Sequence, residues 1–305
     1  MTELLDRGPE RADPIPPPPP APSTEGRRER LARLGRFLRQ RPGLVGSALV
    51  IVFVLLSAFV PGLLAPGDPD FAVPEVKLRP PGTPGHWLGT DYLGRDEWTR
   101  LVHGASLSLE ATVVAVAVAL VVGGLIGLLA GFAGGWVDEV LMRVVDVMLS
   151  IPPILMSLAL ITALGFGTFK VAIAVGIASV ASFARVMRAE TLRVRSSVYV
   201  EAARSVGTRW WVSLGRHVLP NAAGPVTVLA VLEFGLAILA VSSLSFLGYG
   251  TPPPAPEWGS LVAEGRNYLA TSWWLCTIPG VAIAATVLSV NRISRALDGE
   301  WGRAR

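Results

Sequence analysis

The sequence predicts an all-α membrane protein with six transmembrane helices. Hydrophobic residues make up 51% of the 305 residues and charged residues only 16%, a composition that a water-soluble globular domain rarely has. Apolar stretches recur along the chain, and about 20 apolar residues suffice for one membrane-crossing helix. The predicted spans are 42–67, 111–137, 147–169, 168–188, 218–256 and 267–291. An even number of crossings places both chain ends on the same side of the membrane.

Residues 1–41 precede the first span as a tail. The run PIPPPPPAPS has too few apolar side chains to form a packed core, so residues 1–25 are expected to be disordered. The rest of the tail is basic. A secretory signal would place its apolar core nearer the start of the chain, so the first span is interpreted as an anchor that is retained.

Basic residues indicate the orientation of the spans, because cytoplasmic loops carry an excess of Lys and Arg. Seven arginines lie between residues 27 and 41, seven more lie in the connection 185–216, and four follow residue 291. The connection 249–273 has only Arg266. Both termini and the connection 185–216 are therefore expected in the cytoplasm, with the spans in the plasma (inner) membrane.

The two extracytoplasmic segments, 66–105 and 249–273, are long enough to form structured caps over one face of the protein. Turn-forming Gly, Asp and Pro residues are frequent in both. Trp273 and Trp274 lie at the entrance to the last span, where tryptophan commonly lies in the membrane interface. Both are therefore predicted to be interfacial anchors.

The second span carries glycines spaced four residues apart: Gly123, Gly127, Gly131 and Gly135. This spacing places them on one helix face, where small residues let another helix approach closely. Close static packing is the preferred interpretation, and a surface that slides during transport is the alternative.

Charged residues and prolines mark the third span. Glu139 is expected to pair with Arg143, and Arg143 with Asp146, because these residues are four and three positions apart on a helix. Pro152 and Pro153 remove backbone donors and should kink the helix. The kink either shapes a translocation pathway or only fits this helix into the bundle.

Glu233 is the only ionisable residue well inside the fifth span. An unpaired charge is costly in a membrane, so Glu233 should face the interior of the bundle or a water-filled cavity. A place on the translocation pathway is one interpretation, and a protonated or hydrogen-bonded structural carboxyl is the other.

The connection between the fourth and fifth spans is too polar to cross the bilayer and should form short helices parallel to the membrane. Gly207 is placed to end the first of these helices. Trp210 and Trp211 should lie at the membrane surface, and Pro220 and Asn221 should mark the change of direction into the fifth span.

No enzyme site is predicted. The chain has no G-x-x-x-x-G-K-[ST] phosphate loop, no H-E-x-x-H motif and no Cys/His cluster, so no catalytic residue, metal site or nucleotide hydrolysis is expected. The arginines flank apolar runs and form no nucleic-acid-reading module. An intramembrane protease would need Ser106 or Ser150 near His217. Ser106 is predicted at the opposite membrane face, and Ser150 has no partner base. A channel is a further alternative.

The residues Glu201, Ala202, Ala203, Gly207, His217, Leu219 and Pro220 match the spaced E-A-A, G and [HI]-x-L-P pattern of permease subunits in binding-protein-dependent ATP-binding-cassette importers. The chain thus resembles that family. The resemblance implies a five-helix permease core within residues 106–298, preceded by an extra span in 42–105 and followed by a cytoplasmic tail, 299–305. It also implies that residues 201–207 form a coupling helix that docks on an ATPase, with residues 217–220 leading back into the membrane.

The segments HWLGTDYLGRDEWTRLVHGASLSL, VVDVMLSIPPI, SLSFLGYGTPPPAPEWGSLVAEGRNYL and WWLCTIPG are similar to the second, C-type, permease subunit of dipeptide and oligopeptide importers. That group includes nickel and glutathione transporters. Such subunits usually have an acidic residue where Val241 stands.

This narrower resemblance implies half of a translocation pathway for peptides, with nickel or glutathione as the alternative substrate. The implied partners are a second related permease, two ATPase subunits and an extracytoplasmic binding protein. ATP and Mg²⁺ would be bound by the ATPases and no cofactor by this chain.

Overall fold

The computed structural model describes residues 42–301, apart from the side chains of Arg204 and residues 297–301. The predictions of disorder in residues 1–25 and of a basic tail up to residue 41 lie outside the described residues, as do residues 302–305. Within the described part the regular elements are helices, and β-pairing is limited to isolated bridges. The predicted all-α class is confirmed.

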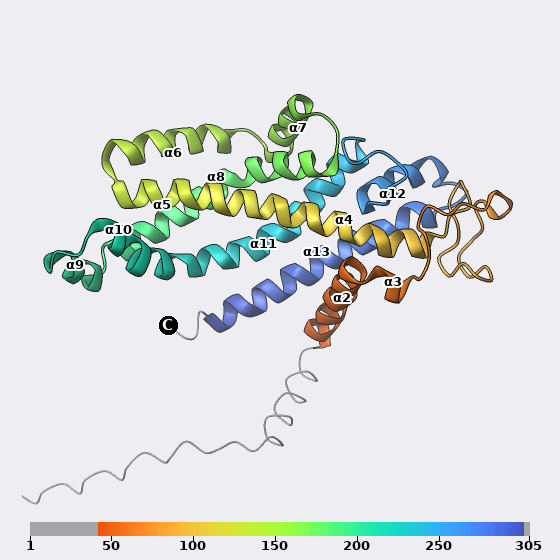
Figure 1. The fold of residues 1–305 in the computed structure, drawn as a ribbon, viewed down its shortest axis with the longest axis horizontal. Helices are drawn as coiled ribbons and strands as arrows, with labels where there is room; N and C mark the ends of the chain where they lie inside the picture. Colours follow the sequence, from red (N-terminus) through yellow and green to blue (C-terminus); the bar gives the residue numbers. More distant parts are fainter. Residues whose placement is uncertain (1–41, 302–305) are drawn as a thin grey trace, which may run out of the picture. The chain divides into compact units, whose positions relative to one another are not determined.

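The main helices follow one another along the chain in Figure 1 as α2 (Pro42–Phe59), α3 (Pro61–Leu64), α4 (Glu97–Val118), α5 (Gly124–Ala133), α6 (Gly135–Ser150), α7 (Pro153–Leu164), α8 (Thr168–Arg195), α9 (Val198–Ser205), α10 (Trp210–Ser213), α11 (Leu219–Phe246), α12 (Trp258–Gly265) and α13 (Trp274–Trp301). π-helical turns at Ala119–Gly123 and Leu214–Val218 join α4 to α5 and α10 to α11. Single 3₁₀ turns occur at Pro74–Val76 and Arg266–Tyr268.

Five helices in the described residues are long and apolar enough to cross a membrane: Pro42–Phe59, Glu97–Ala133, Thr168–Arg195, Trp210–Phe246 and Trp274–Ala296. Helices α6 and α7 meet these criteria only as a pair, which is bent by 96°. The predicted interruption at Pro152 and Pro153 is found, as a sharp break between two helices that count together as one candidate span. Pro152 and Pro153 cannot donate backbone hydrogen bonds, so one helix ends before them and Pro153 begins the next.

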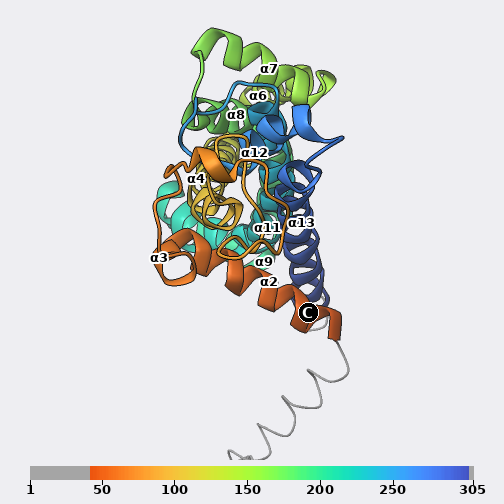
Figure 2. The same cartoon turned by 90° about the vertical axis from the view of Figure 1, so that its right-hand side faces the viewer.

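Helix α8 lies at the centre of the bundle and packs against α4, α5, α7 and α11. Figure 1 shows α4 and α5, α8, α11 and α13 side by side along their length, with α9 and α10 at one end. We call this the α9 end. The opposite, α12 end carries α12 and the connection 65–96, and Figure 2 shows the bundle from that end, with α2 on its outside.

Three of the four predicted ridge glycines form a close seam between α5 and α8. An added Cβ at Gly123, Gly127 or Gly131 would overlap atoms of α8. Gly135 lies outside the seam: its φ is +56°, and an added Cβ would contact nothing within 4 Å. The inclusion of Gly135 in the ridge is therefore wrong, because the chain leaves α5 in a turn at Gly134–Gly135.

The predicted ion pairs within the third span do not form. Asp146 accepts a hydrogen bond of 2.7 Å from Arg185 of α8, and the Asp138 carboxylate accepts two from Arg188, also of α8. Arg143 has no ion pair within residues 42–301. Helices α6 and α8 pack against each other. Asp138 and Asp146 of α6 therefore pair with arginines of α8 and not with Arg143 on their own helix.

A buried charge cluster joins the connection 65–96 to α12. The Arg95 side chain is 2% exposed and donates hydrogen bonds to Asp91 (2.6 Å) and Glu264 (3.0 Å). Arg100 is fully buried and lies 3.3 Å from the same Glu264 carboxylate. Burial raises the pKa of Glu264, although the Arg100 and Arg95 guanidiniums act in the opposite direction. The predicted structured cap thus has a charged centre.

Two indole side chains also hold the α12 end together. Trp258 donates a hydrogen bond to the Leu101 carbonyl (2.9 Å), and Trp274 donates one to the Thr90 carbonyl (3.3 Å). Trp274 is 5% exposed, whereas Trp273 is 55% exposed. The prediction that Trp274 is an interfacial anchor is therefore wrong, because the cap covers it.

Candidate docking surface and transmembrane cavity

Helix α9 lies at the end of the bundle and exposes most of its residues. Val200 is fully buried and packs with Val194 of α8 and Val218 beside α11, which attaches α9 to the ends of both helices. Glu201 and Ala202 are exposed on its other side. The predicted docking residues Glu201 and Ala202 thus lie on an accessible surface, with Ala203 partly buried beside them.

Gly207 ends the α9 segment, as the sequence predicted. Its φ is +84°, in the left-handed region that glycine adopts without strain. The Thr208 amide donates a hydrogen bond of 3.1 Å to the Ala203 carbonyl, which is the pattern of a Schellman C-cap with Gly207 at the C′ position. An exposed Val206, 83% accessible, precedes it. The glycine therefore sets the direction in which the chain leaves the docking surface.

The return into the bundle differs from the prediction. Trp210–Phe246 is one continuous helix, so Pro220 and Asn221 do not mark a change of direction. Pro220 lies in the first turn of α11, directly after the π-helical turn that contains His217. A π turn shifts the hydrogen-bond pattern and thereby accommodates the missing donor of Pro220. Leu219 is 39% exposed.

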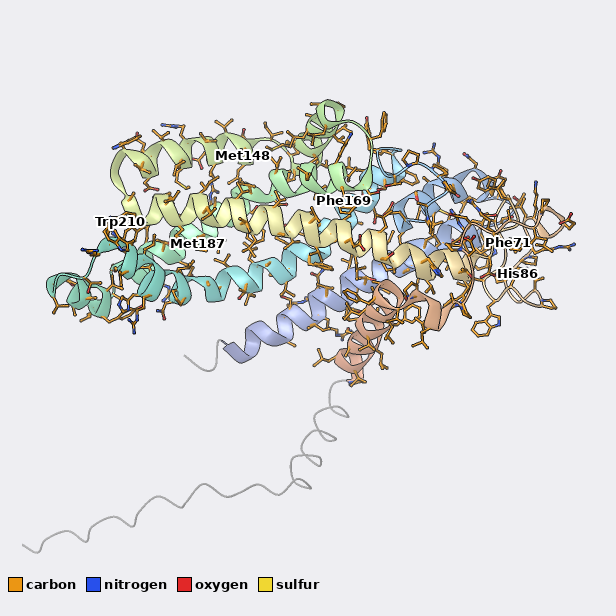
Figure 3. All side chains as sticks on the ribbon, in the orientation of Figure 1. Phe71, His86, Met148, Phe169, Met187 and Trp210 are labelled. Carbon is orange, nitrogen blue, oxygen red and sulfur yellow. The ribbon has the colours of Figure 1, made fainter. Side chains whose placement is uncertain are left out.

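Aromatic and charged contacts join this region to the end of α5. Arg195 donates hydrogen bonds to the carbonyls of Gly131 (3.2 Å) and Phe132 (2.7 Å), which lie in the last turn of α5. The Trp210 ring lies 6.3 Å from the Phe132 ring, and Figure 3 labels Trp210 at this end, opposite Phe71 and His86. Arg195 of α8 and Trp210 of α10 thus attach the last turn of α5 to this end of the bundle.

A cavity of about 470 Å³ lies between α7, α8 and α11. Pro153 of α7 and Glu233 of α11, two of the residues predicted for a pathway, both line it. Pro152 is exposed and is not part of the lining. The first turns of α7, directly after the break, thus form one side of this cavity.

The polar part of the lining is one carboxyl group and several hydroxyl groups. Ser157 of α7, Ser179 and Ser182 of α8, and Ser243 of α11 line the cavity together with Glu233. These serines were not among the residues predicted from the sequence. The pattern A-S-V-A-S over residues 178–182 could have indicated them, because positions three apart share a helix face.

Val241 is 1% exposed and belongs to the apolar core formed with α4, α7 and α8. Glu233 lies two turns away on α11 and faces the cavity. Val241 is therefore packed in an apolar core, whereas Glu233 borders a cavity whose lining also carries hydroxyl groups.

Comparison with known proteins identifies the family of this chain. Residues 123–301 match the family described as the binding-protein-dependent transport system inner membrane component. The chain is 40% identical over 260 residues to the probable D,D-dipeptide transport system permease protein of Escherichia coli (strain K12), covering 85% of this chain and 87% of that protein.

Two further relatives have comparable similarity. A glutathione transport system permease protein of Pectobacterium atrosepticum is 37% identical, covering 86% of this chain and 87% of that protein. A dipeptide transport system permease protein of Alkalihalophilus pseudofirmus is 35% identical, covering 85% of this chain and 84% of that protein.

A solved crystal structure of an amino acid ABC transporter with histidines has the same fold at 16% sequence identity. Its TM-score is 0.51, over 66% of this chain and 94% of that chain. At such low identity this likeness concerns the fold alone. Given the family match and the extent of the relatives' similarity, the chain belongs to the inner-membrane permease subunits of binding-protein-dependent ABC importers.

Proposed function

We propose that this chain is one of two permease subunits that together import small peptides, and that its α9 segment docks on an ATPase subunit. The observation that carries this proposal is the exposed Glu201 and Ala202 surface, ended by Gly207, on a helix held at the tip of the bundle by buried Val200. The further partners would be a second related permease, a second ATPase subunit and an extracytoplasmic binding protein. ATP and Mg²⁺ would bind to the ATPases.

The proposed orientation places the α9 end in the cytoplasm. Arginines of α8 and of the connection to α11 lie at this end, among them Arg193, Arg195, Arg209 and Arg216. At the α12 end, by contrast, Arg95 and Arg100 are buried against acids. This distribution supports the positive-inside assignment. Both chain termini would then be cytoplasmic.

Small peptides are the proposed substrate because relatives of this chain are named for dipeptide transport. Glutathione is the second candidate, favoured by the similarity to a glutathione transport permease. Because glutathione is itself a short peptide, the two substrates place similar chemical demands on a pathway.

The proposed mechanism uses the connections of α9. ATP-driven closure of the ATPases would displace α9. The Val200 contact and the hydrogen bonds of Arg195 would then pass this motion to α8, α5 and α11. Two of these helices, α8 and α11, line the cavity that holds Glu233. The ATPases can shift the permease between outward and inward states only if they contact those states differently.

Cysteine cross-linking tests the docking surface. The only native cysteine is Cys276, so a Cys276→Ser background allows a single cysteine to be placed at Ala202, with a partner cysteine in the groove of the co-expressed ATPase. We expect a cross-link with Ala202→Cys and none with Ala270→Cys, an exposed alanine at the α12 end. Cross-linking at Ala270 alone would overturn the proposed docking surface and orientation.

Transport by the reconstituted complex tests the substrate. We expect ATP-dependent uptake of a labelled dipeptide in the presence of the binding protein. Glu201→Lys should abolish this uptake and ATPase co-purification without lowering the melting temperature, because Glu201 is exposed. Uptake of glutathione or a nickel complex instead of the dipeptide would contradict the peptide assignment.

A further inference from the structure

We infer that the Glu233 carboxylate binds the protonated amino group of a peptide as it passes between α7, α8 and α11. This inference rests on the proposed peptide import and assigns a chemical group of the substrate to one residue of the cavity. It is argued from the charge, depth, polar surroundings and size of the cavity.

Glu233 has no cationic partner in the described residues. It forms neither an ion pair nor a hydrogen bond within residues 42–301. It is also the only ionisable residue in the lining of the cavity. A cavity with one uncompensated carboxylate attracts a cation and repels an anion.

The depth of Glu233 makes the missing partner significant. Glu233 lies near the middle of α11, about 20 Å along the helix from Leu219 at 1.5 Å per residue. A carboxylate at such a depth is costly unless it meets water or an opposite charge. Glu233 is partly exposed and borders the cavity, so a cation that enters the cavity would supply the missing charge.

Serines that line the cavity with Glu233 offer further acceptors for an ammonium group. An ammonium group has three donors, which one carboxylate cannot all accept in good geometry. Ser157 donates its own proton to the Pro153 carbonyl, so its oxygen atom keeps lone pairs to accept with. The hydroxyls of Ser179 and Ser182 have no partner in the described part of the chain.

The size and remaining surface of the cavity suit a short peptide. Its volume of about 470 Å³ lies within the usual range for small-molecule pockets. Apart from Glu233 and the serines, the lining is apolar, with Leu236, Ala237 and Leu239 from α11. An α-amino group is the cation that every unblocked peptide carries at neutral pH, so this site would recognise peptides regardless of their side chains.

Fluorine NMR of ligand binding tests the site without the binding protein. The probe is a trifluoromethyl-labelled dipeptide, compared with its N-acetyl derivative, added at millimolar concentration to the full permease–ATPase complex in nanodiscs. We expect the wild-type complex to broaden the resonance of the free-amine peptide and not that of the N-acetyl peptide. Glu233→Gln should weaken binding of the free-amine peptide about tenfold or more, because a charged hydrogen-bond partner is lost.

Two variants serve as controls. Glu233→Asp keeps the charge and should retain part of the broadening. Glu110→Gln removes an exposed carboxylate of α4 that does not line the cavity, so it should broaden the resonance as the wild type does. If Glu233→Gln fails to assemble, equal broadening of the free-amine and N-acetyl peptides by the wild-type complex still overturns the amine site.

The outcomes separate this inference from the proposed function. Equal broadening of both peptides, no broadening of either, or equal broadening by wild type and Glu233→Gln would overturn the amine site. Peptide import would still stand if the wild-type complex accumulates the dipeptide in proteoliposomes with ATP and the binding protein. Absence of that accumulation would overturn the proposed function itself.

Discussion

Gly207 shows how one backbone conformation shapes the proposed docking surface. Its φ of +84° belongs to the left-handed region, and an added Cβ would contact no atom within 4 Å. Space is therefore not the reason for glycine at this position. The backbone conformation is the reason, because an L-residue is strained there.

We predict that Gly207→Ala destabilises the end of α9 by about 1–2 kcal/mol, the usual strain of a left-handed non-glycine residue. The docking surface would then fray, so ATPase co-purification and coupled uptake should fall while the spans remain folded. Hydrogen exchange of residues 198–208, combined with co-purification, measures both effects.

Gly215 provides the matched control for this substitution. It is exposed, an added Cβ would meet nothing within 4 Å, and it lies within a helical turn without positive φ. Gly215→Ala should leave docking intact. Equal loss of docking in the two variants would show that backbone strain at Gly207 is not the cause.

The seam between α5 and α8 is the closest helix contact that the sequence predicted. At Gly127 an added Cβ would overlap the Ala184 carbonyl of α8, so the two backbones touch without side chains between them. Contacts of this kind depend on small residues because lipid offers no hydrophobic drive for helix association.

We predict that Gly127→Leu forces α5 away from α8 and lowers the free energy of unfolding by about 1–3 kcal/mol, the usual cost of overpacking. The melting temperature of the purified complex in nanodiscs measures this loss. Transport should fall as well, because Arg195 of α8 holds the end of α5.

Gly280 of α13 is the control for the seam. An added Cβ at Gly280 would meet nothing within 4 Å, so Gly280→Leu should change the melting temperature little. A similar loss in the two variants would indicate that added bulk in any span, and not the seam, is what destabilises the protein.

The broken pair α6 and α7 shows the limit of prediction for a single element. Pro152 and Pro153 identify a helix irregularity from sequence, since proline lacks a donor. They cannot specify a bend of 96°, because the angle is set by what α7 packs against. Likewise Pro220 follows a π turn and does not redirect the chain. The chain is helical on both sides of Pro220, so the helix continues through it.

At the scale of the whole molecule, the buried charge cluster ties the connection 65–96 to α12. Glu264 lies within 3.3 Å of both the Arg95 and the Arg100 guanidinium groups, whose side chains are 2% and 0% exposed. Removing one member of a buried pair leaves a charge without compensation.

We predict that Glu264→Gln destabilises the protein by about 3–5 kcal/mol, the usual cost of breaking a buried ion pair. The change leaves both guanidinium groups in place with only Asp91 and Asp70 as acidic partners. Thermal unfolding in nanodiscs measures the loss. Glu75→Gln, at an exposed carboxylate of the same cap, should change stability little, and an equal effect would contradict the argument.

The all-α class, the approximate spans, the glycines of the α5–α8 seam and the helix end at Gly207 could be predicted from the sequence alone. These features are local, because a bilayer demands continuous apolar helices and a left-handed turn demands glycine. The spaced residues from Glu201 to Pro220 also indicated the family, since the pattern lies within one short segment.

The contacts between residues far apart in the sequence emerged only from the folded arrangement of the helices. It placed Pro153, Ser179 and Glu233 around one cavity and covered Trp274 with the cap. The physical reason is that burial and charge compensation are properties of packed helices, and neither the partner nor the surroundings of a side chain are encoded in its own segment.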